Sequence, residues 1–505
     1  MPALIDAILA GQAVSNHRPW PRAIVKEEIW RFVVGQIADG HWTLLGLWGD
    51  AEAVHLAALD EGRSEVGVVS LDCTGRLFPS VAERHPPAIR LERTICDLYG
   101  FEAEASPDTR PWLDHGHWGI RHPLGDQIDS TTPAPGYDFR SAEGEGLHQI
   151  AVGPVHAGII EPGHFRFTAN GEAVVRLEER LGYVHKGIEG LMIGADLARA
   201  AGLAGRTSGD STVAYGLAFA RAAEAALSIE APPRAIWLRA LMGEIERLAN
   251  HFGDIGAICN DASFAMMHAQ CGILRERMLR AADTCFGHRL MRDRIVPGGV
   301  NVDLSAGGTA VLRTLTGEAR QRFAALVKLY DNTASLQDRT VGTGILQPVL
   351  ARQFGCGGYV GRASGRAFDT RRTLPYPPYD KLRFDVPMLL EGDVNARIWI
   401  RIREVEQSLS LIEQILDHLP DGSLMTDIGV KAGEQVEGIA VVEGFRGDVL
   451  VSLSLDPEGK VARCHLRDPS WFQWPVLEAA IEGNIVADFP LCNKSFNCSY
   501  SGHDL

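Results

Sequence analysis

The sequence predicts an α+β protein, in which a small α+β domain precedes a larger, mainly helical domain with β-meanders at its periphery. Near the N-terminus, two segments with alternating, β-branched residues flank a segment of helical composition. Residues 233–259 and 398–416 carry apolar residues at helical spacing, which predicts two long helices. Residues 438–471 predict a β-meander that follows the second of these helices.

The bulk composition limits the class of protein. The chain has 505 residues, of which 46% are hydrophobic and 22% charged, and its formal net charge is −15. This length suggests two or three domains. The acidic balance argues against nucleic acid or an anionic membrane as a general partner, because both need a basic face. The chain has neither an apolar run of about 18 residues nor the basic start of a secretory signal, so we expect no transmembrane helix and no export.

Nine cysteines are scattered along the chain, and none belongs to a C-x-x-C pair. This spacing predicts the reduced thiols of a cytosolic protein rather than a disulfide framework. It also offers no zinc ribbon and no ferredoxin-like cluster site. If electrons reach the protein through iron–sulfur clusters, we expect a partner chain to carry them, and we expect no firmly bound cofactor here.

The first domain is expected over residues 1–110. Residues 42–49 and 65–73 predict strands, and residues 50–62, which end in a glycine, predict a helix between them. Residues 90–100 predict a surface helix that also ends at a glycine. A compact α+β unit follows from this order of elements.

A linker separates this unit from the second domain. Residues 111–145 are rich in Pro, Gly, Asp and His and lack periodicity, so they predict a segment that crosses the surface. The second domain then covers residues 146–505. It opens with a predicted hairpin or meander over residues 153–174, in which Asn170-Gly171 is a strong turn signal. Residues 177–192 predict the start of a helix.

Residues 202–224 open with small and polar residues and become a clear helical pattern from Thr212 onward. Ser208, Asp210 or Ser211 can cap that helix, because their side-chain oxygens accept hydrogen bonds from its unpaired N–H groups. A helix N-terminus behind a glycine-containing turn can also hold an anion or a reactive group. The sequence leaves both interpretations open, and the cap is the simpler one.

Polar edges accompany the apolar faces of the two long helices. Residues 244, 247 and 251 (Glu, Arg and His) follow one edge of the first helix, where half-buried polar groups need partners. Beside the apolar stripe of the second helix, four polar residues recur at helical spacing: Arg397, Arg401, Glu404 and Ser408. They predict either an ion-pair network between packed helices or ordinary pairing on one helix surface.

Two sets of motifs resemble one group of proteins. The segment E-R-x-x-x-D-L-Y-G-F, residues 92–101, and the P-D-x-R that follows resemble the signature of the thirty-kilodalton subunit of respiratory complex I, although Ala105-Ser106 replaces its usual Gly-His. Later motifs resemble the large subunit shared by complex I (its forty-nine-kilodalton subunit) and the energy-converting nickel–iron hydrogenases. They are G-P-x-H, E-P-G-H-F-R, G-Y-x-H-K-G-x-E, E-x-x-R-x-x-x-H, P-G-G-V-x-x-D-L, D-R-x-x-G-x-G and G-R-A-S-G. The resemblance implies a thirty-kilodalton-like domain fused to a large-subunit-like domain.

This resemblance implies where a metal site would stand. The hydrogenase relatives hold nickel and iron with two C-x-x-C pairs, and thiolates suit such a soft site. Aligned without gaps, the four cysteine positions fall at Ala204, Thr207, Ser499 and Gly502. A one-residue shift would recover Cys498 alone, so we expect no nickel–iron centre. The relatives that load nickel also carry an extension that is cut three residues after the last cysteine, and we expect none here, because the chain ends at that point.

The quinone-binding pair of the forty-nine-kilodalton subunit is also replaced. Its His and Tyr correspond to Ile160 and Gly205, whose side chains cannot hydrogen-bond a quinone. We expect other polar groups at the old cavity to donate, accept or relay protons. The candidates are Arg206, Thr207, Ser208, Asp210 and Ser211 on one wall, and His156, Glu161, His164 and Arg166 opposite.

Magnesium and NAD are two further ligands to consider for this chain. The relatives use the glutamate of the H-[KR]-G-x-E motif near a magnesium site or to anchor helices, and this residue matches Glu189, which makes Glu189 a magnesium candidate. No G-x-G-x-x-G follows a predicted strand, so we do not expect NAD to bind this chain.

The resemblance implies a function in a membrane-associated complex. We expect the large subunit of a complex I-like or hydrogenase-related oxidoreductase, taking part in NADH:quinone-oxidoreductase-like electron transfer coupled to ion translocation, at the cytoplasmic face of the membrane. Its expected partners are a small iron–sulfur subunit and integral membrane subunits, and a quinone is the expected small acceptor. Two alternatives stay open: a non-catalytic scaffold and, more remotely, a working nickel–iron hydrogenase. An apolar plug would favour the scaffold, whereas residues 207–211 are mostly polar.

Overall fold

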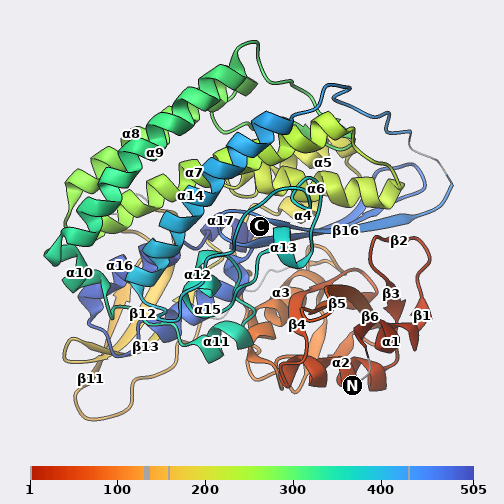
Figure 1. The fold of residues 1–505 in the computed structure, drawn as a ribbon. Coiled ribbons are helices and arrows are strands. Elements are labelled where there is room, and N and C mark those ends of the chain that lie inside the picture. The colour runs from red at the N-terminus through yellow and green to blue at the C-terminus, as the bar shows by residue number, and fades with distance from the viewer. Residues whose placement is uncertain (1–2, 130–136, 157–159, 430–432) are drawn as a thin grey trace.

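The computed structural model describes residues 3–129, 137–156, 160–429 and 433–505. An N-terminal α+β unit, red to orange in Figure 1, lies against a larger unit dominated by long helices. The predicted α+β class and the predicted order, a small mixed unit before a mainly helical one, are both confirmed.

The N-terminal unit is built on a five-stranded sheet of order β1-β3-β6-β5-β4. Its strands are β1 (Gln12–Ala13), β3 (Arg22–Ile24), β4 (Thr43–Gly49), β5 (Ala53–Asp60) and β6 (Glu65–Asp72). Its helices are α1 (Leu4–Leu9), α2 (Glu27–Ala38), the 3-10 helix η1 (Pro86–Ala88) and α3 (Ile89–Tyr99), and a short pair joins β7 (Leu77–Pro79) to β8 (Glu102–Glu104). The strands expected at 42–49 and 65–73 and the helix that ends at Gly100 are therefore confirmed. The expected surface position of this helix is wrong, because most of α3 is buried, including Glu92 and Arg93.

The helix expected over residues 50–62 is wrong, because β5 occupies that segment. Its alanines, leucines and acidic residues favour a helix in isolation. In the folded protein, β5 pairs antiparallel with both β4 and β6 and is buried along most of its length. The central place in the sheet thus overrides the local helical propensity.

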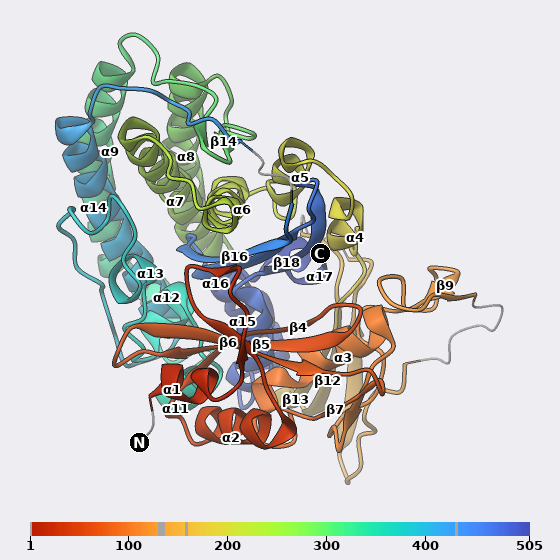
Figure 2. The ribbon, with the colours of Figure 1, turned by 90° about the vertical axis from the view of Figure 1, so that its right-hand side faces the viewer.

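A second sheet joins the two units. Its order is β18-β17-β16-β2, formed by β16 (Val436–Glu443), β17 (Asp448–Leu455), β18 (Val461–Arg467) and the N-terminal β2 (His17–Arg18). This confirms the predicted meander, and the pairing of β2 with β16 adds an N-terminal strand to it. Apolar residues of β4 and β6 pack against those of β16 and β17. Figure 2 shows this second sheet between the N-terminal sheet and the helices.

Long helices cover the other face of the second sheet. Helix α6 (Thr212–Leu227) packs directly on β16 and β17. Around it lie α5 (Leu197–Ala204), α7 (Pro233–Asp261), α8 (Ala265–Phe286), α9 (Gly308–Asn332) and α14 (Val394–His418). Both predicted long helices are confirmed as α7 and α14. Their apolar stripes, for example Leu241 and Phe252 in α7, are buried in one large core.

Shorter elements complete the large unit. The predicted hairpin is confirmed as β12 (His164–Asn170) and β13 (Ala173–Arg180), with β11 (Leu147–Val152) beside it. The helix expected from residue 177 is delayed, because β13 continues to Arg180 and α4 (Ile188–Met192) follows. The remaining elements are β9 (Ile120–Arg121), β10 (Ile128–Asp129), β14 (Ile295–Val296), β15 (Gly299–Val300), α10 (Ala334–Thr340), α11 (Pro348–Gln353), α12 (Gly358–Ala363), α13 (Thr370–Thr373), α15 (Ser470–Ala480), η2 (Val486–Asp488), α16 (Phe489–Phe496) and α17 (Tyr500–Asp504).

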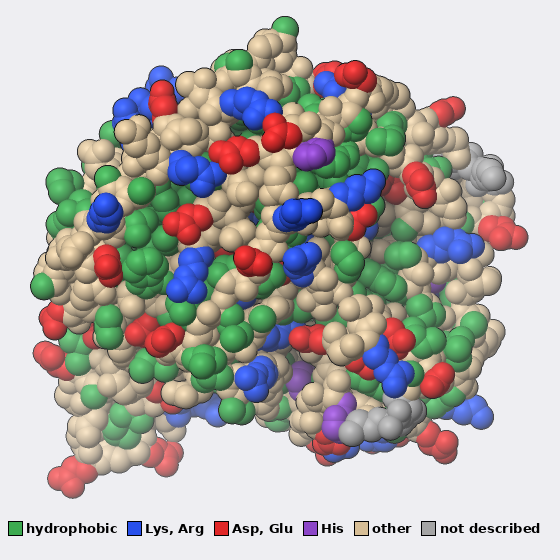
Figure 3. Space-filling view, in the orientation of Figure 1, with side chains coloured by type: hydrophobic (Ala, Val, Ile, Leu, Met, Phe, Trp, Pro, Cys, Tyr) green, Lys and Arg blue, Asp and Glu red, His purple; other side chains and the backbone are tan. Residues whose placement is uncertain are grey.

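The surface carries charges of both signs. On the face drawn in Figure 3, basic and acidic side chains are interspersed rather than gathered into one basic area. Among the described residues, no helix combines the length and the hydropathy needed to cross a membrane.

Candidate functional site

The two stretches that correspond to the metal-binding halves of the relatives meet in the folded protein. Residues 204–211 run from the end of α5 to the start of α6, and residues 497–502 run from the end of α16 into α17. The Ser208 Oγ and Ser499 Oγ atoms lie 2.9 Å apart and form a buried hydrogen bond. Ser499 Oγ also accepts a hydrogen bond from Gly502 N at 2.9 Å, which caps α17. The alignment therefore identified two segments that are far apart in sequence and adjacent in space.

The donor atoms at these positions do not fit a nickel–iron centre. Ala204 offers a methyl group and Gly502 no side chain, while Thr207 and Ser499 offer hydroxyls. A Cβ atom at residue 502 would lie 2.4 Å from the Asp468 carboxylate, so the packing leaves no room for a cysteine there. Nickel and iron sites of this class need soft thiolate ligands, which hydroxyl groups do not replace.

The nearby cysteines do not restore the missing ligands. Cys498 Sγ points toward Gln473 Oε1, 4.0 Å away, and burial raises the pKa of its thiol well above the usual value. Cys492 lies beside Gly344 and Arg397, on another side of α16. In the described part of the chain, no group of three or more His, Cys, Asp or Glu side chains has the arrangement of a metal site.

Asp210 and Arg446 form the charged part of the site. Two guanidinium nitrogens of Arg446 lie 2.7 and 2.6 Å from the two oxygens of Asp210, and Ser208 Oγ donates to Asp210 at 2.9 Å. Burial opposes ionisation of this carboxyl, but Arg446 and the hydrogen bonds outweigh it and lower the pKa of Asp210 to about 2. Asp210 therefore stays ionised at neutral pH, which favours a fixed charge over the proton relay expected for it.

The first turn of α6 is capped from another helix. Ser211 stands at the N-cap position, but its side chain makes no capping bond. Instead, Glu246 of α7 accepts hydrogen bonds from Val213 N at 2.7 Å and Ala214 N at 3.1 Å. The expectation that residue 208, 210 or 211 caps this helix is thus wrong, because those oxygens are engaged with one another, with Arg446 and with Ser499.

A small cavity opens beside this turn. Its volume is about 150 Å³, and Asp210, Glu246 and Asn250 contribute polar groups to its wall. Asn250 Nδ2 donates to the Asp210 carbonyl oxygen at 2.8 Å. Arg275, Arg289, Leu279 and Met291 line the opposite part. Two carboxyl groups therefore line one small cavity, and their pKa values are shifted in opposite directions: that of Asp210 is lowered and that of Glu246 is raised.

The hydroxyl groups of Thr207, Ser208 and Ser499 form what we call the hydroxyl cluster. Glu161 and Lys186 lie at its rim. Glu161 Oε2 accepts a hydrogen bond from Ser501 N at 3.0 Å. Lys186 Nζ donates to the carbonyl oxygens of Thr207 and Ser501 at 3.3 and 3.4 Å. Burial lowers the pKa of Lys186, while Glu161 and Asp504 oppose that shift. The structure thus places Glu161 at Ser501, while Lys186 links Ser501 to Thr207.

Thr207 is the least satisfied member of this wall. Its side chain is fully buried, and its Oγ1 has no hydrogen-bond partner among the described residues. An orphaned buried hydroxyl is costly, because burial removes it from water without replacing the lost bond.

Three of the predicted residues lie away from the cluster. Arg206 is exposed and pairs with Asp293 at 2.7 Å. His164 Nδ1 donates a hydrogen bond to Gly153 O, and Arg166 contacts His164 at 3.4 Å and lies over the Phe139 ring. Both residues lie on β12, where His164 is buried and Arg166 is half-buried. His156 is half-buried in the segment before residues 157–159, which lie outside the described chain.

The environment of Glu189 does not fit magnesium. Its carboxylate contacts Arg463 and His465, each at 2.8 Å, and accepts a hydrogen bond from Leu466 N. Burial opposes ionisation, but these two partners lower the pKa of Glu189 to about 2. An arginine at this distance repels a cation, so the helix-anchoring role fits this residue and a metal ligand does not. Because His465 also stacks on Trp48, Glu189 fixes α4 to the seam between the two units.

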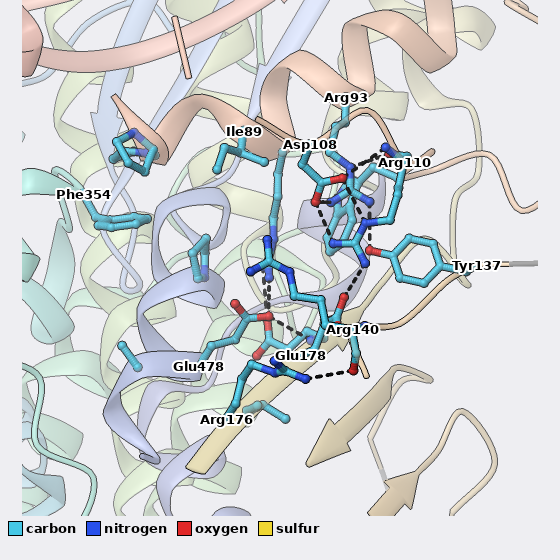
Figure 4. Close-up of a pocket in the computed structure, with 18 of the residues that line it drawn as sticks. Ile89, Arg93, Asp108, Arg110, Tyr137, Arg140, Arg176, Glu178, Phe354 and Glu478 are labelled. Atoms are coloured by element: carbon cyan, nitrogen blue, oxygen red, sulfur yellow. Dashed lines mark hydrogen bonds and ion pairs between the residues drawn. The ribbon is translucent and has the colours of Figure 1, made fainter. Parts of the chain in front are cut away.

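A second charged cavity lies at this seam, between α3, β13 and α15. Its volume is about 310 Å³. Figure 4 shows Asp108 between Arg93 and Arg110, at 3.2 and 2.7 Å, and Glu178 bonded to Arg110 at 2.6 Å. These charges are largely paired with one another, and the pairs connect the two units. Because paired charges are less available to a ligand, the hydroxyl cluster is the better functional candidate.

The polar edges of α7 and α14 form an interior ion-pair network. Arg362 of α12 is fully buried and contacts Glu404, Asp369 and Glu443 at 2.7, 3.3 and 3.0 Å. His251 Nε2 lies 2.8 Å from Glu404. The four polar residues expected on α14 are all buried, which decides for the interior network and against surface pairing: Arg397, Arg401, Glu404 and Ser408.

Sequence reasoning missed three functional candidates. Arg446 lies in the turn of the predicted meander, and Lys186 lies in the motif G-Y-x-H-K-G-x-E. Nothing local to either segment indicates that Lys186 reaches Thr207 or that Arg446 reaches Asp210. Glu246 lies between two residues of the polar edge of α7 and points to a different face. A carboxylate at this position has no partner within its own helix, and that absence was the available signal.

Comparison with known proteins identifies relatives over most of the chain. Residues 261–433 and 427–504 match the family model described as respiratory-chain NADH dehydrogenase, 49 Kd subunit. Formate hydrogenlyase subunit 5 of Escherichia coli is 32% identical over 448 residues, which cover 86% of this chain and 78% of that protein. The carbon monoxide-induced hydrogenase of Rhodospirillum rubrum is 30% identical, over 69% of this chain and 97% of that protein. A subunit of the NADH-quinone oxidoreductase of Syntrophobacter fumaroxidans is 31% identical, over 68% of this chain and 93% of that protein.

Proposed function

We propose that this chain, which belongs to the family of the respiratory-chain NADH dehydrogenase 49 Kd subunit, is the large subunit of a complex I-like or hydrogenase-related oxidoreductase. We also propose that it works without a nickel–iron centre. It would take part in electron transfer coupled to ion translocation. The names of its relatives support this proposal, since they include subunits of formate hydrogenlyase and of NADH-quinone oxidoreductase.

One observation carries the nickel-free part of the proposal. The Ser208–Ser499 hydrogen bond joins the two segments that correspond to the metal-binding pairs, at 2.9 Å. Both oxygens are buried and already bonded, to Asp210 and Gly502 N respectively. A cluster that is closed by its own hydrogen bonds and offers hard oxygen atoms favours hydrogen-bond chemistry over the binding of a soft metal.

The polar wall suggests how a small acceptor would be held. At the rim, the ammonium group of Lys186 can donate a hydrogen bond to a carbonyl oxygen of a quinone, and the carboxylate of Glu161 can accept one from a hydroxyl group of the reduced quinol. Ser208 and Ser499 behind them keep residues 207 and 501 in place. Asp210 and Arg446 add a fixed ion pair that orients the loop.

The partners follow from what this chain lacks. All nine cysteines are free and eight are buried, and no pair of them has the spacing of a cluster site. We therefore assign the iron–sulfur clusters to a small partner subunit and the ion path to integral membrane subunits, with this chain placed peripherally at the cytoplasmic face of the membrane.

The proposal is tested on the purified complex with reduced methyl viologen as donor and a short-chain quinone as acceptor. Changing Lys186→Met removes the cationic donor at the rim, and we expect quinone reduction to fall about tenfold while the subunit composition is unchanged. Lys460→Met, at an exposed turn, is the matched control. An unchanged rate in Lys186→Met would support the scaffold interpretation, and hydrogen-dependent viologen reduction would support a working hydrogenase.

A further inference from the structure

Glu246 is a buried carboxyl group without a cationic partner. Its side chain extends from α7 to the first turn of α6, and only 8% of the residue is exposed. Its two oxygens accept hydrogen bonds from Val213 N and Ala214 N, at 2.7 and 3.1 Å. Within the described residues, no lysine, arginine or histidine forms an ion pair with it, which is unusual for a buried carboxylate.

The charged groups around Glu246 compensate its charge only in part. Asp210 lines the same cavity with the same sign of charge, and Asp210 holds the guanidinium of Arg446. Arg247, the next residue of α7, points to the other side, where it donates to the carbonyl oxygens of Glu443 and Gly444. The cations on α8 and after it belong to the opposite wall. Arg275 lines the cavity there, and Arg289 pairs with Glu276 at 2.7 Å.

Opposing effects therefore act on this carboxyl. The helix N-terminus and its two N–H groups favour the ionised form, as they do for any anion at such a position. Burial favours the protonated form more strongly, and the negative charge of Asp210 adds to this effect. The pKa of Glu246 therefore rises to about 8. Both protonation states are thus populated near neutral pH.

The cavity offers a path for a proton to this group. Its volume of about 150 Å³ is enough for several water molecules, and Asp210, Glu246 and Asn250 supply the polar partners that such water needs. The same carboxylate oxygens hold Val213 N and Ala214 N, in the helical turn that directly follows the loop with Ser208 and Asp210. Glu246 therefore lies next to the wall of the hydroxyl cluster.

We propose that Glu246 is a proton-binding site of the protein, which takes up a proton from the cavity and thereby loosens the first turn of α6 beside the hydroxyl cluster. Uptake converts the carboxylate to a carboxylic acid and moves no electron. One of its oxygens then becomes a hydroxyl donor, so one of the N–H groups of Val213 and Ala214 loses its acceptor. The inference concerns proton binding alone and stands whether or not the complex reduces a quinone.

Infrared spectroscopy of the purified complex, titrated from about pH 5 to about pH 10 without electron donor or acceptor, tests this site. We expect the band of a protonated buried carboxyl to disappear with a midpoint of about 8. Other buried carboxyls, such as Glu92, also have raised pKa values, so the test is the part of the band that Glu246→Gln removes. We expect Glu246→Gln to lose the component with a midpoint of about 8 and Glu458→Gln, a change at an exposed turn, to keep it. Identical carboxyl titrations in Glu246→Gln and the unmodified protein would overturn the proposal.

Hydrogen exchange supplies a second test that needs no variant to fold. After correction for intrinsic rates, we expect protection of the amides in residues 212–215 to fall about tenfold from about pH 9 to about pH 6, because one capping bond is lost. The middle of α6 and the first turn of α14, capped by Asp393, should keep their protection. Protection at residues 212–215 that does not change, or that rises on acidification, would contradict the coupling.

Discussion

Two glutamates on α7, Glu244 and Glu246, stand two residues apart and meet opposite environments. Glu244 points toward α13 and α14, where Arg371 lies 2.9 Å away and Ser408 and Tyr379 donate hydrogen bonds. Burial opposes its ionisation, but these partners outweigh burial and keep the pKa of Glu244 below its usual value. Glu246 has only backbone N–H groups, and burial prevails there.

This difference distinguishes two regions, which we call the structural region, around Glu244, and the chemical region, around Glu246. Glu244 is held by Arg371, Arg247, Ser408 and Tyr379, which keep it ionised and connect α7 with α13 and α14. The region around Glu246 lies at the edge of the hydroxyl cluster and keeps one carboxyl free to titrate. The identity of the residue is the same, and the neighbours decide its role.

The largest effect is expected from breaking the structural region. Arg362→Met leaves Glu404, Glu443 and Asp369 without their shared cation in the core, and we expect the free energy of unfolding to fall by about 5 kcal/mol. Urea denaturation of the purified chain measures it. Arg313→Met, which removes an exposed pair with Asp417, should change it by less than about 1 kcal/mol. Similar losses in the two variants would contradict the distinction.

A pH-dependent effect is expected from the chemical region. Because the folded-state pKa of Glu246 is about 8 and the ordinary value is 4.5, its stabilising contribution is present at low pH and is lost as the pH rises toward 8. The stability of Glu246→Gln relative to the unmodified chain should therefore increase by on the order of 4 kcal/mol between about pH 5 and about pH 9. Thermal unfolding at both pH values measures it, and parallel curves for the two proteins would argue against the raised pKa.

An intermediate effect is expected at the ion pair of the cluster. Arg446→Met removes the partner of Asp210 and the donor to Asn497 O, which lies 2.6 Å from Arg446 Nε. Since the Asp210 side chain keeps 36% of its exposure, water replaces part of the loss, and we expect destabilisation of about 2 kcal/mol. The double variant Arg446→Met with Asp210→Asn should recover about half of that loss. No recovery would mean that the two residues are not coupled.

The smallest effect is expected at Arg206, the predicted site residue that lies outside the cluster. Its pair with Asp293 is exposed on both sides, so Arg206→Met should change the stability by about 0.5 kcal/mol and leave quinone reduction unchanged. Calorimetry and the viologen–quinone assay measure the two quantities. A tenfold loss of quinone reduction would place Arg206 in the site after all.

A feature of this molecule could be predicted from the sequence when the pattern that indicates it is local in the sequence. Periodic elements such as α7 and α14 were predictable, because an apolar stripe is a local pattern. The meeting of residues 208 and 499 was predictable only through the resemblance to a family. The strand at residues 53–60 and the cap supplied by Glu246 were not predictable, since each depends on partners brought in by the tertiary fold.

The most direct test of the account is the nickel content of the complex purified from cells grown with nickel, measured by mass spectrometry together with the iron content. The account predicts nickel far below one atom per large subunit, because Ala204, Thr207, Ser499 and Gly502 supply no thiolate. The iron content should match the clusters of the partner subunit. One tightly held nickel atom per chain would contradict the hydroxyl-lined site described above.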